Sequence, residues 1–428
     1  MCLFGSAAGA CISQGGQRPG FAGSGADNGA AGAGGAAGTR GPVPGRGSGD
    51  FVEDHRAECA IPAMPAVSAL QDVAPMPDPF TSMSGSAVTT KDQWRCRREE
   101  IAAMAEYYEL GDKPRYPETV TGAMSGSTLT ITVADQGKSI SFAVTITTPA
   151  GSGPFPAVIG YGGGSLGTAL SGLPVATINY DNFGLATDGT THGQGLFYDL
   201  YGSSHSAGAI MAWAWGTSRI VDALMATPEA GIDPTHLAVT GCSRNGKGAF
   251  VAGVYDQRIA LTIPQEGGSG GCSSWRVIAY DKAQGANIEQ ISNVAGGTNW
   301  FRPSFSGTFS SATNKIPYDH HELAGAVAPR ALLSIENVID WLGPDATFAN
   351  NVATREVFDA LGAPDAHTYS LPPAHDHCQL PSSQVHWVQS YVKKYLLGQT
   401  GESSAIEAPV GYTFDRATWI DWATPALQ

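Results

Sequence analysis

The sequence predicts an α/β fold in which helices cover both faces of a mainly parallel central sheet. Short apolar or β-branched runs, typical of buried strands, recur along the chain, and longer helical patterns separate several of them. Apolar strands that alternate with helices usually lie in a parallel sheet that is covered on both sides. We therefore expect a three-layer αβα sandwich.

The sheet is expected to begin with an antiparallel pair of strands. Residues 128–133 (TLTITV) and 139–148 (SISFAVTITT) place an apolar side chain at every second position, as strands with one solvated face do. Short apolar runs predict the other strands, at 156–161, 175–180, 236–240, 259–263 and 331–335. Helical patterns occupy 207–224 and 247–255.

The composition excludes several classes of protein. The chain has 428 residues and a net charge of −14, so it has no general attraction for nucleic acid or anionic membranes. No apolar run reaches the roughly 18 residues of a membrane-spanning helix. Residues 13–50 are mostly Gly, Ala, Ser and Pro, which predicts a flexible tether. We expect 1–50 to be an N-terminal segment with this tether and 51–428 to be a single folded domain.

Seven cysteines are scattered along the chain, at 2, 11, 59, 96, 242, 272 and 378. They form no CxxC pair and no Cys/His cluster with zinc spacing, so we interpret them as disulfide partners in an oxidising compartment. Their odd number leaves at least one cysteine unpaired, removed or joined to another chain. The stretch 8–11 (AGAC) faintly resembles a bacterial lipoprotein cleavage site. We expect a secreted protein, with a lipid anchor as the alternative.

A serine on a glycine-flanked turn is the central candidate for chemistry. The segment 236–250 (HLAVTGCSRNGKGAF) predicts a strand followed by a helix that begins just past Ser243. Such a turn lifts the hydroxyl above the sheet and places it at a helix N-terminus, where free N–H groups stabilise negative charge. The amide of Arg244 is then the expected oxyanion donor. The usual pattern is G-x-S-x-G, whereas here Asn245 precedes the second glycine, Gly246.

A base and an acid are expected later in the chain. His377, or its neighbour His375, lies in a loop (AHDHCQL) after the last expected strand. The order serine, acid, histidine is that of the α/β-hydrolases, so the sandwich is predicted to have this fold. Glu266 and Asp340 each follow an expected strand, and the sequence order permits either as the acid.

Several segments of the chain match the motifs of one enzyme family. They are GYGGGSL at 160–166, DLYGSSHSAGA at 199–209, GCSRNGKGA at 241–249, DHHEL at 319–323, IDWLGP at 339–344 and HC at 377–378. On these motifs the chain resembles the glucuronoyl esterases, especially the fungal-type members, from roughly 59 to 399. The tether and the tail after 401 lie outside the resemblance.

The resemblance implies a serine carboxylic ester hydrolase with a triad of Ser243, His377 and Glu266, in which Arg244 helps to hold the oxyanion. The family's substrate is an ester of 4-O-methyl-D-glucuronic acid, which joins glucuronoxylan to lignin alcohols in wood. No metal or other cofactor is expected, and neither is a nucleic-acid partner. We expect a monomer.

The resemblance also implies two disulfides. Cys242 and Cys378 would join the residues next to the nucleophile and the base, and Cys59 and Cys96 would fix the N-terminal segment. A third bridge of the family is expected to be missing, because Cys272 has no partner near 346–350. We therefore expect Cys272 to be a free, buried thiol.

Two further residues are expected to contact a sugar. Lys247 lies one helical turn past Ser243 and would hydrogen-bond sugar hydroxyls, unless it is a helix-surface lysine. Trp341 would stack on a sugar face, the alternative being that it fills the core.

One segment departs from the family pattern. In 287–301 the family usually has Gln and Glu against the uronate hydroxyls, whereas this chain has Glu289, with Gln290 beside it, and Gly297. Glu289 and Gln290 are therefore expected in the substrate site, with an altered preference. The departure keeps open a carbohydrate esterase for another acyl group, such as acetyl-xylan. A non-catalytic carbohydrate-binding scaffold is the third interpretation, against which the intact candidate triad argues.

Overall fold

The computed structural model describes residues 47–48, 51–412 and 414–428. The described residues belong to one compact unit. The lipoprotein-like stretch at 8–11 and most of the expected tether lie outside the described residues. At the end of the tether segment, β1 (Gly47–Ser48) pairs with β2 (Phe51–Val52) in a small antiparallel sheet.

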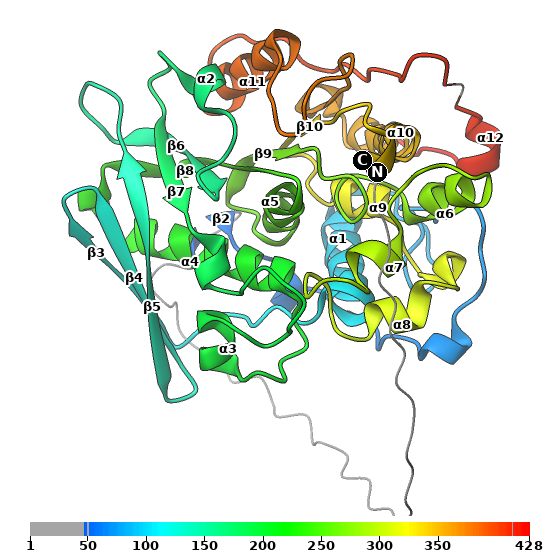
Figure 1. The fold of residues 1–428 in the computed structure, drawn as a ribbon, viewed down its shortest axis with the longest axis horizontal. Coiled ribbons are helices and arrows are strands. Elements are labelled where there is room, and N and C mark those ends of the chain that lie inside the picture. Colours follow the sequence, from blue (N-terminus) through cyan, green and yellow to red (C-terminus); the bar gives the residue numbers. More distant parts are fainter. Residues whose placement is uncertain (1–46, 49–50, 413) are drawn as a thin grey trace, which may run out of the picture. The chain divides into compact units, whose positions relative to one another are not determined.

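A nine-stranded sheet forms the centre of this unit, with the strand order β11-β10-β9-β8-β6-β7-β5-β4-β3. Figure 1 labels its strands from β3 to β10. The strands from β11 to β7 are parallel, and β5, β4 and β3 extend the sheet in antiparallel pairing. The bounds are β3 (Thr119–Ser125), β4 (Thr128–Asp135), β5 (Lys138–Thr147), β6 (Phe155–Tyr161), β7 (Ala176–Tyr180), β8 (Ile232–Cys242), β9 (Ile259–Gln265), β10 (Ala331–Ile335) and β11 (His367–Ser370). The predicted mainly parallel sheet is confirmed.

Burial explains which strands the sequence predicts. In β4 the side chains of Leu129, Ile131 and Val133 are fully buried and the residues between them are half-buried, which produces the alternating pattern. All seven predicted strands are present, and the antiparallel pairing of β4 with β5 is confirmed. The sequence pattern misses β3 (TVTGAMS), which has few apolar residues, and β11 (HTYS), which is only four residues long.

Helices cover both faces of the sheet (Figure 1). Successive residues of the central strands point to opposite faces, so they pack in two separate cores, each covered by helices. In β6, Ala157 and Ile159 pack in the larger core and Val158 packs in the smaller one. The larger core is covered by α1 (Lys91–Ala105), α4 (Ala209–Ala226), α5 (Arg244–Tyr255), α9 (His320–Gly325) and α10 (Pro344–Ala360). The smaller core is covered by α2 (Gly167–Leu170) and α11 (Ser382–Tyr395).

Shorter elements lie in the connections. They include α3 (Leu196–Tyr201), α6 (Trp275–Ala283), α7 (Ile291–Val294), α8 (Phe305–Phe309), α12 (Arg416–Trp419) and the 3-10 turn η7 (Asp340–Leu342). A disulfide between Cys59 and Cys96 ties the N-terminal segment to α1. Cys272 is buried and outside any disulfide, as predicted. Among the described residues, no helix is long and apolar enough to cross a membrane.

Candidate active site

Ser243 lies on the turn between β8 and α5, at the carboxyl end of the parallel strands. Its backbone has a φ of 60° and a ψ of −128°, a strained conformation for any residue except glycine. The Ser243 amide donates to the carbonyl of Gln265 at 2.9 Å, and the Ser243 carbonyl accepts from the amide of Lys247 at 3.0 Å. The neighbouring strand and the first turn of α5 therefore fix the serine in this conformation.

Close backbone approach explains the unusual glycine spacing of this turn. A Cβ atom on Gly241 would lie 2.4 Å from the carbonyl oxygen of Asn245, and one on Gly246 would lie 2.5 Å from that of Gln265. Position 245, by contrast, has room for a side chain. The Asn245 side chain is held there by a hydrogen bond, in which its Oδ1 accepts from Asn182 Nδ2 at 3.0 Å. The second glycine is needed at 246, where α5 meets β9.

Glu266 and His377 form a carboxylate–imidazole pair next to this turn. Glu266 directly follows β9 and is fully buried, and its Oε2 lies 2.6 Å from Nδ1 of His377. The same oxygen accepts the amide of Cys378 at 3.0 Å. Burial by itself would raise the pKa of Glu266, but the hydrogen bonds from His377 and Cys378 together hold that pKa below its usual value. An ionised Glu266 keeps the proton of the ring on Nδ1 and leaves Nε2 as a base.

The geometry separates the alternatives that the sequence leaves open. Glu266 contacts His377, whereas Asp340 is exposed at the start of η7. His375 Nδ1 lies 3.8 Å from Glu266 Oε1, beyond hydrogen-bond distance, and 3.2 Å from Asn337 Nδ2. The His375 side chain is 8% exposed and that of His377 is 30% exposed. Glu266 and His377 are therefore the better placed acid and base.

A disulfide joins the residues that flank the serine and the histidine. Cys242 precedes Ser243, Cys378 follows His377, and the two cysteine Cα atoms are 5.7 Å apart. This pairing and that of the N-terminal segment are the ones that the resemblance implied. Ser243, Glu266 and Cys378 all have positive φ, at 60°, 47° and 66°. Strained residues persist only where the surrounding structure fixes them, and here the disulfide and the bonds to Glu266 do so.

The same cluster does not fit a metal ion. A ring nitrogen of His377 and the sulfur atoms of Cys242 and Cys378 lie within 4.8 Å of one another. Metal ions bind thiolate sulfur, whereas both of these sulfur atoms belong to the disulfide. The cluster therefore offers a metal ion a single imidazole nitrogen.

Asp188 holds the side chain of Arg244 beside the serine. Arg244 Nε lies 3.0 Å from Asp188 Oδ2, and Trp300 Nε1 donates to Asp188 Oδ1 at 2.8 Å. Lys247 Nζ lies 5.4 Å from the centre of the Trp300 ring, within cation–π range. The side chain of Asn299 makes three hydrogen bonds to the backbone on either side of Asp188 and so fixes its loop. One carboxylate therefore positions both Arg244 and the ring beside Lys247.

The glycine turn after β6 does not offer free amides to an oxyanion. In many α/β-hydrolases an amide of this loop is the second oxyanion donor. Here the amides of Gly162, Gly163 and Gly164 donate to backbone carbonyls at 2.8, 3.1 and 3.0 Å. The amide of Arg244 directly follows Ser243 at the N-terminus of α5, where amides have no partner within the helix.

Lys247 is buried one turn into α5, so the alternative of a helix-surface lysine is wrong. Its Nζ donates to the carbonyl of Gly267 at 2.6 Å. Burial lowers the pKa of Lys247 to about 8, although the negative charges of Glu289 and Glu336 oppose the shift. Glu336 is itself fully buried against Gly267, and burial together with the charge of Glu266 raises its pKa to about 8.

Trp341 and Glu289 border the same site. Trp341 packs edge-on against His377, with ring centroids 4.9 Å apart and an interplanar angle of 72°, and it stays partly exposed. The Glu289 amide donates to the carbonyl of Trp341 at 3.2 Å, and the Glu289 carbonyl accepts from Ser269 Oγ at 2.6 Å. Glu289 also lies within electrostatic reach of Lys247.

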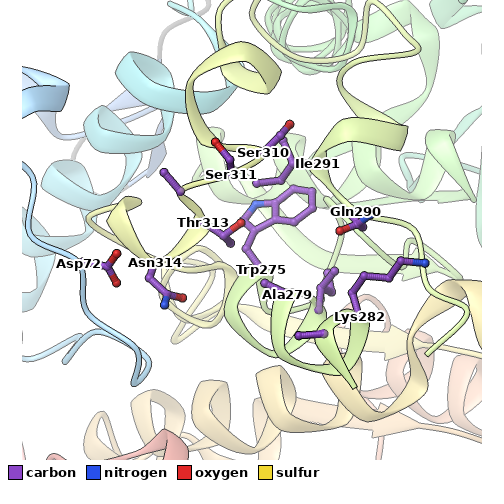
Figure 2. Close-up of a pocket in the computed structure, with 13 residues that line it drawn as sticks. Asp72, Trp275, Ala279, Lys282, Gln290, Ile291, Ser310, Ser311, Thr313 and Asn314 are labelled. Carbon is purple, nitrogen blue, oxygen red and sulfur yellow. The ribbon is translucent and has the colours of Figure 1, made fainter. Parts of the chain in front are cut away.

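Gln290 is the predicted substrate residue that the structure places elsewhere. It lines a separate cavity of about 370 Å³, which Figure 2 shows with Trp275 and Lys282. Ser243 does not line this cavity. The backbone is extended at Gln290, so its side chain and that of Glu289 point in opposite directions. We use the name catalytic cluster for Ser243, Glu266, His377 and the side chains around them. Of the two predicted contacts, only Glu289 lies beside this cluster.

Several residues of the site are missing from the sequence prediction. They are Asp188, Trp300, Gln265, Asn337 and Glu336. Buried Gln265 donates to Glu266 Oε1 at 3.3 Å and to the carbonyl of Gln379 at 2.9 Å. Glu336 could have been found, because it directly follows a predicted strand at the end where α/β sheets bind ligands. The loop that carries Asp188 has no pattern that would have singled it out.

These features define the class of protein. A mainly parallel sheet covered on both faces, a serine on the strand–helix turn after β8, and a carboxylate-bound histidine on a later loop are the features of an α/β-hydrolase.

Comparison with known proteins identifies the family. A family model described as glucuronyl esterase, fungi, matches residues 131–362. The 4-O-methyl-glucuronoyl methylesterase of Hypocrea jecorina (strain QM6a) is 48% identical over 370 residues, which cover 86% of this chain and 79% of the relative. That of Schizophyllum commune is 42% identical over 380 residues, which cover 87% of this chain and 95% of the relative.

Comparison with solved structures leads to the same family. The glucuronoyl esterase catalytic domain from Hypocrea jecorina has a TM-score of 0.81 and 47% identity, covering 85% of this chain and 100% of that one. A mutant glucuronoyl esterase from Sporotrichum thermophile, in complex with methyl 4-O-methyl-beta-D-glucopyranuronate, has a TM-score of 0.82 and 42% identity, covering 86% of this chain and 100% of that one. The chain belongs to the fungal glucuronoyl esterase family.

Proposed function

We propose that the chain hydrolyses esters of (4-O-methyl-)D-glucuronic acid, such as those between glucuronoxylan and lignin alcohols, through an acyl-enzyme on Ser243. The observation that carries the proposal is the 2.6 Å contact between Glu266 Oε2 and His377 Nδ1 next to the Ser243 turn. The relative in complex with a methyl glucopyranuronate ester supports the choice of substrate.

Acylation uses His377 first as a base and then as an acid. Its Nε2 takes the proton of the Ser243 hydroxyl while the serine oxygen attacks the uronoyl carbonyl carbon. When the tetrahedral intermediate collapses, the bond from that carbon to the alcohol oxygen breaks, and His377 gives its proton to the leaving alcohol. Glu266, whose pKa is lowered, stays ionised and stabilises the imidazolium between these two transfers.

Deacylation repeats the same steps with water. His377 takes a proton from the water that attacks the acyl carbon, and returns it to the oxygen of Ser243 when the acyl bond breaks. One ester and one water give glucuronic acid and one alcohol, and the enzyme returns to its starting state.

Arg244 supplies the oxyanion donors in this proposal. Its amide is at the free N-terminus of α5, and Asp188 holds its guanidinium at the same edge of the sheet. The amides of Gly162–Gly164 are occupied, so the guanidinium takes the place of the second backbone donor.

Substrate recognition is assigned to three side chains around Ser243. Lys247 donates from its ammonium group to sugar hydroxyls, and Trp341 offers a ring next to His377. Glu289 accepts from a hydroxyl, at the position where the family resemblance implies a glutamine. This set leaves out Gln290.

A second candidate is a carbohydrate esterase for another acyl group, such as acetylated xylan. Gly297 is exposed and has no side chain, so it offers no side-chain contact where the family resemblance implies a glutamate. A protein with weakened uronate binding and an intact serine would still hydrolyse small esters.

We also propose that 51–428 act as a single catalytic domain, and that the protein is secreted and works as a monomer. The two disulfides support an oxidising compartment. Size-exclusion chromatography with light scattering tests the oligomeric state, and a dimer mass would overturn that part.

Hydrolysis of benzyl glucuronate beside p-nitrophenyl acetate, by the wild type and by Ser243→Ala, tests the function. We expect serine-dependent turnover of the glucuronate ester with little turnover of the acetate. Turnover of the acetate alone would favour the second candidate, and turnover that survives Ser243→Ala would refute the mechanism.

A further inference from the structure

A cavity of about 680 Å³ lies at the end of the sheet opposite to Ser243. Its walls come from the first half of α1, from the residues just before β9 and β10, and from those just after α10. Ser243 and Glu266, by contrast, follow β8 and β9 at their carboxyl ends. The length of a buried strand separates the cavity from the catalytic cluster, roughly 20 Å at about 3.3 Å per residue.

Positive charge dominates the lining of this cavity. Lys91, Arg95, Arg98 and Arg330 line it, and Asp92 is the only acid among the described lining residues. This is unusual in a chain with a net charge of −14. Arg98 and Arg330 bind backbone carbonyls and the Gln257 amide oxygen, and neither forms an ion pair with a described residue. Arg95 pairs at 3.4 Å with Glu58, whose side chain is 54% exposed.

The lining residues also carry buried N–H groups that lack acceptors. Nε of Arg95, Arg98 and Arg330 and Nε1 of Trp94 are buried and have no hydrogen-bond acceptor among the described residues. Trp94 and Arg98 are 2% and 7% exposed. A buried donor without a partner costs about 1–3 kcal/mol. These four donors belong to residues that line one cavity.

The charges of the arginines are unfavourable to one another. Burial, and then the charge of Arg98, lower the pKa of Arg330 to about 9, although the charges of Asp256 and Glu99 oppose the shift. Burial and the charge of Arg95 likewise lower the pKa of Arg98, although Glu99 opposes the shift. A bound anion in the cavity would offset this repulsion between the arginines.

We propose that this cavity binds a small organic carboxylate, with the carboxylate oxygens on the N–H groups of Arg98 and Arg330. The volume is larger than an inorganic ion requires and lies within the range of small-molecule sites, about 300–1,000 Å³. Pro329 and Leu361 add an apolar wall for the body of the ligand. The site itself does not depend on the reaction at Ser243. Only the choice of glucuronate as probe rests on the proposed function, because that reaction would release it.

Calorimetric titration of the protein with sodium glucuronate, and separately with sodium sulfate, tests the site without any turnover. Under the proposed function glucuronate is also a product at the Ser243 site, so the readout is a comparison of variants. The double variant Lys91→Gln/Arg95→Gln changes two cations that are exposed or half-buried, and Arg98→Gln changes the buried one. Lys282→Gln is the matched control, because this exposed lysine lines the separate cavity of Figure 2.

We expect millimolar or tighter glucuronate binding that weakens by about fivefold or more in both cavity variants. Binding should be unchanged in Lys282→Gln, and the fivefold difference should persist when Ser243 is replaced by alanine. Sulfate that binds as tightly as glucuronate would overturn the organic carboxylate. No binding by the wild type, or equal binding by all variants, would overturn the site. If Arg98→Gln does not fold, the variant Lys91→Gln/Arg95→Gln still tests whether the cavity binds glucuronate.

Discussion

Replacement of Asp188 by asparagine should lower turnover without unfolding the protein. The carboxylate lies 3.0 Å from Arg244 Nε, and the two side chains are 22% and 46% exposed. An ion pair this exposed contributes only about 0–1 kcal/mol to stability. Asparagine still accepts from Trp300 but no longer attracts the guanidinium. Loss of a whole oxyanion donor lowers kcat by about 10²–10³-fold. Because the Arg244 amide remains in Asp188→Asn, we expect about a tenfold loss, or about 1.4 kcal/mol of transition-state stabilisation.

Steady-state kinetics on benzyl glucuronate, with urea unfolding of the same proteins, measures this effect. Glu356→Gln is a matched control, since the Arg416–Glu356 pair has a similar contact of 2.6 Å and side chains that are 45% and 21% exposed. We expect Glu356→Gln to change stability as little as Asp188→Asn does, and to leave kcat unchanged.

A double-mutant cycle decides whether Asp188 acts through Arg244. In an Arg244→Met background, Asp188→Asn should have almost no further effect on kcat, because the group that it positions is gone. An undiminished tenfold loss in that background would refute the positioning role. Equal kcat for wild type and Asp188→Asn would refute it as well.

Three further predictions concern the turn, the acid and the buried carboxyl group. Gly246→Ala should lower the free energy of unfolding in urea by about 2 kcal/mol, because its Cβ would lie 2.5 Å from the Gln265 carbonyl; an unchanged midpoint would contradict this. Glu266→Ala should lower kcat by about 10³-fold or more, and Asp340→Ala should lower it far less. A larger loss in Asp340→Ala than in Glu266→Ala would show that Asp340 is the acid of the triad. Glu336, with its folded pKa raised to about 8, should stabilise the fold below its unfolded pKa of about 4.3 and lose that contribution as the pH rises through 8. Between pH 5 and pH 8 the free energy of unfolding should therefore decrease less in Glu336→Gln than in the wild type. An equal decrease in the two proteins would contradict this.

The fold was predictable because most of its strands are recognisable locally. β4 and β5 each have one buried face and alternate, whereas the almost fully buried β9 and β10 are mostly apolar, so each pattern reflects the surroundings of its strand. β3 and β11 are held in the sheet by pairing with a neighbour rather than by their own apolar pattern, and the sequence does not show that pairing.

The site was predictable only in part, for the same reason. Ser243 sits on a turn whose glycines are visible in the sequence, so it could be found locally. The choice between Glu266 and Asp340 depends on which loop meets His377 in space. Asp188 and Trp300 come together from segments 112 residues apart, so no local pattern links them. Gln290 lines a different cavity from its neighbour Glu289, because one step along an extended backbone reverses the direction of a side chain.

Covalent labelling of the nucleophile tests the central claim most directly. The wild type would be treated with a fluorophosphonate that modifies activated serines, and the adduct would be located by peptide mass spectrometry while benzyl glucuronate hydrolysis is followed. We expect a single adduct on Ser243 that forms in step with the loss of hydrolysis, and forms far more slowly in Glu266→Ala. An adduct on another residue, or full hydrolysis by completely labelled protein, would contradict the assignment of Ser243, His377 and Glu266.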